Sequence, residues 1–212
     1  MRSKFDEQLA LLNRDLTKMG SLCALALAAK ALANADGQTA AKIAPIDSEI
    51  DQMERTIESL CLKLLLQQQP VARDLRQISA ALKMITDMER IGDQASDIAE
   101  IIGFLNGRIG TDAQYICQMA VAAMRMVTES VEAYVKRDVA MAEATIQHDD
   151  VVDDLFLKVK ESLIQMISEN PKDGEYALDL LMIAKYFERI GDHATNIAEW
   201  VVFSVTGVHE QV

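Results

Sequence analysis

The sequence contains little of what interrupts helices or builds sheets. Its 212 residues include only three prolines and nine glycines, and aromatic residues make up 5%. Proline and glycine are unfavourable inside helices, and aromatic residues are enriched in strands. Ala, Leu, Ile and Met are abundant, and this composition favours helices. We therefore predict an all-α protein.

Cysteine is also scarce. Cys23, Cys61 and Cys117 are an odd number, and none of them belongs to a Cys-x-x-Cys pair. Each lies in an apolar helical context, which favours a buried free thiol. We expect these thiols to stay reduced, as they would in the cytosol.

Long apolar runs are missing. No segment approaches the roughly 18 consecutive apolar residues that a transmembrane helix needs. The first residues, 1–7, lead into an amphipathic pattern and not into the apolar core of a signal peptide. We expect a soluble cytoplasmic chain that does not insert into the membrane directly.

Basic residues are outnumbered. Lys and Arg total 21 against 33 Asp and Glu, which gives a formal net charge of −12. This balance opposes binding to nucleic acid or to anionic lipid. The expected counterparts are cations or a basic patch on a partner protein.

The usual motifs of covalent catalysis are absent as well. The sequence has no Gly-rich phosphate loop, no Ser/His/Asp or Cys/His arrangement and no His-Glu-x-x-His motif. We therefore do not expect a nucleophilic enzyme.

What the chain does contain is a twelve-residue string that occurs twice. Nine of the twelve positions are identical at an offset of 99 residues. A repeat of this kind indicates that one unit of roughly a hundred residues is used twice. The two copies are Glu89-Arg-Ile-Gly-Asp-Gln-Ala-Ser-Asp-Ile-Ala-Glu100 and Glu188-Arg-Ile-Gly-Asp-His-Ala-Thr-Asn-Ile-Ala-Glu199.

Helical periodicity and helix breakers divide the chain into six stretches. Short connections between long helices favour antiparallel neighbours, so we predict two tandem, sequence-related three-helix bundles, 1–107 and 108–212. Pro45 should kink the second helix or delay its start. The expected helices are about 5–32, a second one up to 67, 71–105, 112–137 with Asp112 as N-cap, 138–169 and 173–203.

The repeated string places acidic residues on one face of a helix. Glu89, Asp93 and Asp97 are spaced four residues apart and form one stripe, from which Arg90 is expected to point away. Apolar residues earlier in the same helix form a packing seam, and the acidic stripe continues that seam. A mid-helix glycine at the same place in both copies, Gly92 and Gly191, suggests the close approach of a neighbour or ligand.

A second acidic set lies one helix earlier and is also duplicated, at an offset of 102. Each half then carries two acidic i, i+4 pairs on adjacent antiparallel helices, which could converge on a hard or borderline metal ion. His193 is a weaker candidate, expected beside the ligands or at the surface. The candidate metal ligands are Asp47, Asp51, Glu89, Asp93, Asp97, Asp149, Asp153, Glu188, Asp192 and Asn196.

Three other interpretations remain open from the residues alone. The acidic faces could be ordinary solvated surface, or they could dock a basic partner without metal. A carboxylate-bridged bundle that stores or oxidises metal is the main alternative, although no histidine follows a glutamate by three residues on the acidic face.

The segment Gln69-Pro-Val-Ala-Arg-Asp-Leu-Arg76, followed by the two repeated strings, strongly resembles the PhoU family of phosphate-uptake regulators. The resemblance spans nearly the whole chain. It implies a two-bundle, non-enzymatic cytoplasmic protein that represses phosphate uptake and the phosphate-starvation response.

Partners and cofactors follow from the same resemblance. It implies coupling between a phosphate ABC transporter, through its ATPase subunit, and a two-component sensor histidine kinase at the inner face of the membrane. It also implies a homodimer and bound metal ions, of which multinuclear iron is the first choice and manganese, magnesium or zinc are alternatives. The matching (Glu/Asp)-x-x-x-Asp pairs are Asp47/Asp51, Glu89/Asp93, Asp149/Asp153 and Glu188/Asp192.

Overall fold

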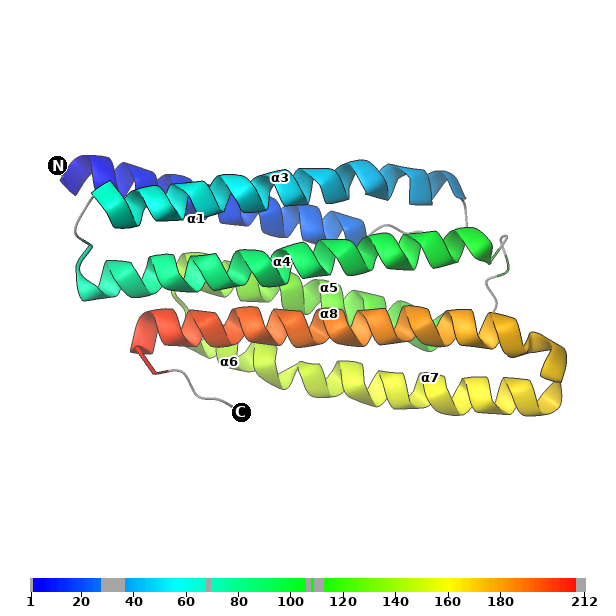
Figure 1. The fold of residues 1–212 in the computed structure, drawn as a ribbon. Coiled ribbons are helices and arrows are strands. Elements are labelled where there is room, and N and C mark those ends of the chain that lie inside the picture. The colour runs from blue at the N-terminus through cyan, green and yellow to red at the C-terminus, as the bar shows by residue number, and fades with distance from the viewer. Residues whose placement is uncertain (1, 28–36, 68–69, 106–107, 109–112, 209–212) are drawn as a thin grey trace.

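The computed structural model describes residues 2–27, 37–67, 70–105, 108 and 113–208. Within these ranges the regular structure is entirely helical, which confirms the all-α prediction (Figure 1). The helices are α1 (Arg2–Leu27), α3 (Gly37–Gln67), α4 (Ala72–Phe104), α5 (Gln114–Lys136), α6 (Val139–Gln147), α7 (Asp149–Glu169) and α8 (Gly174–Thr206), with a short 3₁₀ turn, η2 (Pro171–Asp173), before α8.

The helices lie lengthwise in an elongated bundle (Figure 1). α1, α3 and α4 form the first repeat. In the second repeat α6 and α7 together take the place of one long helix between α5 and α8, so the two predicted three-helix bundles are present. α4 packs most extensively against α8, and α1 also contacts α5. The repeats are therefore joined along their length. The predicted boundary at 107 and 108 adjoins residues outside the described ranges and stays a prediction.

One hydrophobic core runs through both repeats. Its fully buried side chains include Leu16 and Met84 from the first repeat and Phe187 from the second. The buried Tyr134 hydroxyl donates a hydrogen bond of 2.9 Å to the Gln77 carbonyl in the other repeat. Since apolar burial is the main favourable term in folding, the shared core makes the two repeats a single packed body.

The cysteines are free thiols, as predicted. Cys23 and Cys61 are buried and Cys117 is half-buried. Burial raises the pKa of both Cys23 and Cys61 to about 12, which keeps them as neutral thiols. They act as small apolar core residues.

The breaks near Pro70 and Pro171 agree with the prediction, but the helix expected over 138–169 is divided at His148. The Asp138 carboxylate caps α6 by accepting from the Met141 N–H at 3.0 Å, and α7 begins at Asp149. At the offset of 102, Gln147 corresponds to Pro45, which lies inside the continuous helix α3. Pro45 therefore does not delay the start of α3, and the interruption occurs in the other repeat at nearly the same place.

Two expectations fall outside the described residues: the end of the first helix near residue 32 and the role of Asp112 as N-cap. No described helix combines the length and the apolar character that a membrane span requires.

Candidate metal centre

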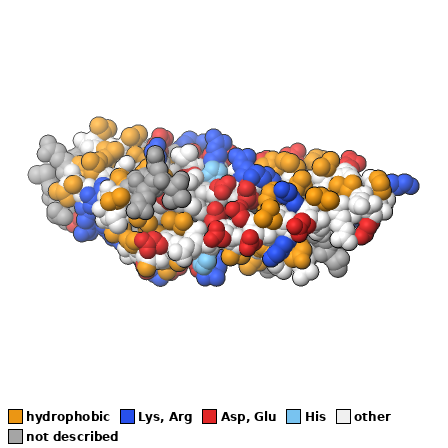
Figure 2. Space-filling view, turned by 90° about the horizontal axis from the view of Figure 1, so that it is seen from below, with side chains coloured by type: hydrophobic (Ala, Val, Ile, Leu, Met, Phe, Trp, Pro, Cys, Tyr) orange, Lys and Arg blue, Asp and Glu red, His pale blue; other side chains and the backbone are white. Residues whose placement is uncertain are grey.

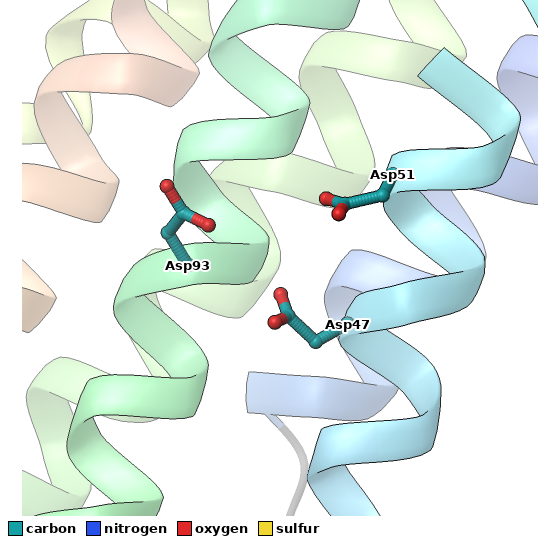
Figure 3. A group of neighbouring side chains, drawn as sticks. All are labelled: Asp47, Asp51 and Asp93. Atoms are coloured by element: carbon teal, nitrogen blue, oxygen red, sulfur yellow. The ribbon is translucent and has the colours of Figure 1, made fainter. Parts of the chain in front are cut away.

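The acidic pairs face each other across α3 and α4. Asp47 and Asp51 are one turn apart on α3 and point toward Asp93 on α4 (Figure 3). One carboxylate oxygen of each residue lies within 4.8 Å of the others. Residues at i and i+4 share a helix face, so a single helix supplies two of the three groups. Three of the four acids expected to converge in the first repeat therefore do so, and Glu89 is not part of the group.

Two glycines allow this approach. A Cβ atom at Gly92 would lie 3.3 Å from Asp47 Oδ1 and 3.0 Å from Ile50 Cδ1. In the second repeat, a Cβ atom at Gly191 would lie 2.8 Å from Asp149 Oδ1. The repeated glycine therefore makes room for a carboxylate from the neighbouring helix, which confirms the close approach that the sequence suggested.

The carboxylate oxygens at these glycines are buried without a partner. Among the described residues, neither Asp47 Oδ1 nor Asp149 Oδ1 has a hydrogen-bond donor, and both atoms are shielded from solvent. Buried polar atoms are normally paired, because leaving one unpaired costs free energy. An unpaired oxygen beside further carboxylates is suited to a cation.

The pKa values show how unfavourable the accumulated charge is. Burial, followed by repulsion from Asp51 and Asp93, raises the pKa of Asp47. Burial and four acidic neighbours, of which Asp192 contributes most, raise the pKa of Asp149 to about 6. A nearby positive charge would therefore stabilise the ionised form of both carboxylates.

Glu89 on α4 lies beside this centre. Burial, and then repulsion from Asp93, raises the pKa of Glu89. Arg90, expected to point away, instead donates from Nη1 to Asp93 Oδ2 at 3.2 Å and lies 3.5 Å from Glu89. That expectation is wrong, because the long arginine side chain reaches Asp93, three residues further along the helix.

The second repeat holds the corresponding acids differently. Asp149 and Asp153 on α7 face Glu188 and Asp192 on α8. Lys185 donates to both Glu188 carboxylate oxygens at 2.5 Å. Figure 2 shows acidic side chains gathered near the middle of the molecular face on which α7 lies, with basic side chains around them.

Asp97 and Asn196 bind the opposite repeat. The Asn196 amide on α8 donates to Asp87 Oδ1 on α4 at 3.2 Å, and the Tyr186 hydroxyl on α8 donates to Asp97 on α4. At the offset of 99, Asp87 corresponds to Tyr186 and Asp97 to Asn196, so the two contacts are equivalent by the repeat. Their predicted roles as metal ligands stay predictions, since both side chains have other partners here.

His193 also contacts the opposite repeat. His193 Nδ1 is hydrogen-bonded to Asp87 Oδ1 at 2.8 Å, so its ring faces the first repeat. Asp87, Lys185 and the half-buried Glu54 were not among the residues predicted from the sequence. Each has a chemically different residue at the repeat-equivalent position, so the duplicated pattern does not mark it. A comparison of the differences between the repeats would have found them.

Comparison with known proteins identifies the fold and the repeat together. The sequence model of the PhoU domain matches residues 16–102 and again residues 116–201. The chain belongs to the PhoU family. One copy of the duplicated string lies in each matched segment.

Relatives match over nearly their full length. The chain is 36% identical to a phosphate-specific transport system accessory protein PhoU homolog of Clostridium acetobutylicum, covering 97% of this chain and 96% of that protein. It is 33% identical to the corresponding Pseudomonas aeruginosa homolog, covering 96% and 86%. Both relatives are, by name, accessory proteins of phosphate-specific transport systems.

Solved structures agree with the fold. The crystal structure of PhoU from Pseudomonas aeruginosa superposes with a TM-score of 0.91 at 33% identity, covering 96% of this chain and all of that chain. The phosphate transport system regulatory protein PhoU from Streptococcus pneumoniae superposes with a TM-score of 0.88 at 24% identity, covering 98% and 100%. The latter likeness concerns the fold alone.

Proposed function

We propose that this chain is a regulatory accessory protein of a phosphate-specific ABC transporter. It acts as a negative regulator of phosphate uptake and of the phosphate-starvation response, and it is not a catalyst. The observation that carries the proposal is the match to PhoU homologs over almost the whole chain, with the family domain in both repeats. Because fold alone does not determine function, the near-complete length of these matches matters most.

The partners are the transporter's ATPase subunit and a two-component sensor histidine kinase. The chain works as a homodimer in the cytoplasm and reaches the inner face of the membrane through these partners. The elongated bundle supports this role because it offers long helical faces on both repeats (Figure 1).

Metal binding at the acidic faces is part of the proposal. Asp47, Asp51 and Asp93, with Glu89 beside them, would hold metal in the first repeat, and the corresponding acids of α7 and α8 would do so in the second. The unpaired buried oxygens and the glycine cradles fit such a group. Oxygen donors suit iron in multinuclear form, or manganese or magnesium, better than softer ions. A bound metal supplies positive charge that offsets the repulsion between facing helices.

Co-purification tests the partner assignment. The tagged full-length chain is isolated from its native cells, and bound proteins are identified by mass spectrometry. We expect the phosphate transporter ATPase subunit and one sensor histidine kinase to be enriched over an untagged control. Recovery of neither protein, under conditions that retain other known membrane complexes, would contradict the proposed coupling.

Iron turnover separates this function from the main alternative. A metal-oxidising bundle consumes oxygen and converts ferrous iron over many equivalents. An adaptor binds a fixed amount and stops. We expect oxygen uptake no greater than a buffer control once the binding sites are filled. Sustained turnover would favour the oxidising bundle.

A further inference from the structure

The two acidic centres differ in the residues that face the motif glutamates. In the second repeat, Lys185 contacts both oxygens of Glu188 at 2.5 Å. The equivalent of Lys185 in the first repeat is Thr86, which carries no charge. The same position along α4 and α8 therefore holds a hydroxyl in one centre and a cation in the other.

A second difference lies opposite the first one. The Lys185 ammonium lies 5.6 Å from the centre of the Phe156 ring on α7, within the range of a cation–π contact. At the offset of 102, Phe156 corresponds to Glu54 on α3. Glu54 is half-buried, and its charge contributes to the raised pKa of Glu89, after burial and Asp93. One centre thus has a carboxylate where the other has a ring that positions a lysine.

Both differences place less negative charge in the centre of α7 and α8 than in the centre of α3 and α4. Burial and neighbouring carboxylates raise the pKa of Asp153 and Asp192, whereas Lys185 opposes that rise. In the first repeat Arg90 pairs with Asp93 and lies 3.5 Å from Glu89. The Asp93 side chain is 41% exposed whereas that of Glu188 is 16% exposed, so solvent screens the Arg90–Asp93 pair more than the pair of Lys185 with Glu188. Within the described residues, only Asp47, Asp51 and Asp93 bring three carboxylates within 4.8 Å of one another.

We propose that the two repeats are unequal metal sites. The centre formed by α3 and α4 is the tight site, and the centre formed by α7 and α8 is the weak one. Lys185, positioned by Phe156, already supplies positive charge beside Glu188, where a metal ion would otherwise supply it. This inference rests on the proposed metal binding, and it assigns to Lys185 and Phe156 a role that selects which repeat is loaded first.

Exchange of the paired residues tests the inference. Binding of Mn²⁺ to the chelator-treated full-length protein is measured by titration calorimetry. We expect one tight and one weak site in the wild type. The double variant Phe156→Glu with Lys185→Thr carries the residues of the first repeat and should bind at the second site at least about tenfold more tightly, as expected for a change in the close surroundings of a metal.

Two single variants locate the sites. Asp93→Asn should remove the tight site, and Asp192→Asn should leave it intact, with unchanged circular dichroism in both. As the converse exchange, Glu54→Phe with Thr86→Lys should weaken the tight site. Circular dichroism confirms that each variant is folded, and the opposite directions expected of the two exchanges cannot both result from general damage.

The outcomes distinguish this inference from the proposed function. Equal affinities in the wild type, or loss of the tight site in Asp192→Asn, would overturn the inequality while leaving metal binding in place. An unchanged second site in the double exchange would overturn the role of Lys185 and Phe156. Absence of any Mn²⁺ binding to the wild type would overturn both the metal part of the proposed function and this inference.

Discussion

His193 on α8 lies 2.8 Å from Asp87 Oδ1 on α4, and the same oxygen accepts from Asn196. Asp87 thereby joins the repeated string of the second half to the helix that carries the string of the first. The Tyr186–Asp97 contact repeats the arrangement in the reverse direction. The polar residues between α4 and α8 therefore connect the helices that carry the two acidic centres.

Removing Asp87 should weaken this connection. Asp87→Ala leaves the half-buried His193 and the Asn196 amide without their shared acceptor. We expect the free energy of unfolding to fall by about 1–2 kcal/mol, as for the loss of hydrogen bonds to a charged group. Urea denaturation followed by circular dichroism measures it.

Glu143→Ala, which removes an exposed acid of α6, serves as the control and should change stability by no more than about 0.5 kcal/mol. Equal effects of the two substitutions would show that Asp87 contributes nothing specific to the joining of the repeats.

Replacement by alanine should have different effects at the motif glycine Gly191 and at Gly103, which lies outside the motif. Gly191→Ala places a Cβ atom 2.8 Å from Asp149 Oδ1, so it should displace that carboxylate and lower both the affinity for metal and the melting temperature of the metal-loaded protein. Gly103→Ala is the matched control in α4, where a Cβ atom meets nothing within 4 Å.

Alanine is favoured over glycine in helices by about 1 kcal/mol, so Gly103→Ala should leave stability unchanged or raise it. Thermal melts with Mn²⁺ bound compare the two variants. A higher melting temperature for Gly191→Ala would mean that Asp149 moves aside at no cost and that the glycine is not needed for its approach.

Stability of the metal-free protein should depend on pH through Asp149. Its pKa is about 6 in the folded protein, above the ordinary 3.8, so the folded state holds this proton more tightly than the unfolded state. Stability is therefore greatest below about pH 4, falls as the pH rises toward 6 and stays low above that.

Asp149→Asn should flatten this part of the pH profile and raise stability at pH 7 by about 1–2 kcal/mol, after allowance for solvent screening. Asp6→Asn, at an exposed position of α1, should leave the profile unchanged. Urea titrations with chelator from pH 4 to 7.5 measure both. A wild-type stability that rises over this range would contradict the assignment.

Salt should stabilise the metal-free protein more than the loaded one. Repulsion among the clustered carboxylates is screened over a Debye length of about 8 Å at physiological ionic strength. Bound metal removes much of that repulsion and adds stability by binding the folded state. Melts across a salt series, with and without chelator, should give a steeper slope for the metal-free protein. Equal slopes would indicate an ordinary solvated acidic surface.

The fold and the main site were accessible from the sequence because both rest on periodicity. Acidic i, i+4 pairs on neighbouring helices predicted the meeting of Asp47, Asp51 and Asp93, and the repeated glycine predicted their close approach. Duplication made each pattern visible twice.

The remaining features depend on how helices meet, which periodicity along one helix does not specify. The contact of Asp87 with His193 needs the relative register of α4 and α8. The approach of Lys185 to Phe156 likewise depends on the packing of α7 against α8. The interruption at His148 carries no proline or glycine that would mark it in the sequence.

The central claim is that this chain restrains the phosphate-starvation response. Its most direct test is a phosphate-starvation reporter in a strain that lacks its own PhoU protein and grows in abundant phosphate. Expression of the full-length chain, with the cognate transporter and sensor kinase present, should return the reporter to its repressed level, whereas an empty vector leaves it high. A reporter that stays high, although the chain is folded and expressed at the level of the missing protein, would contradict the account.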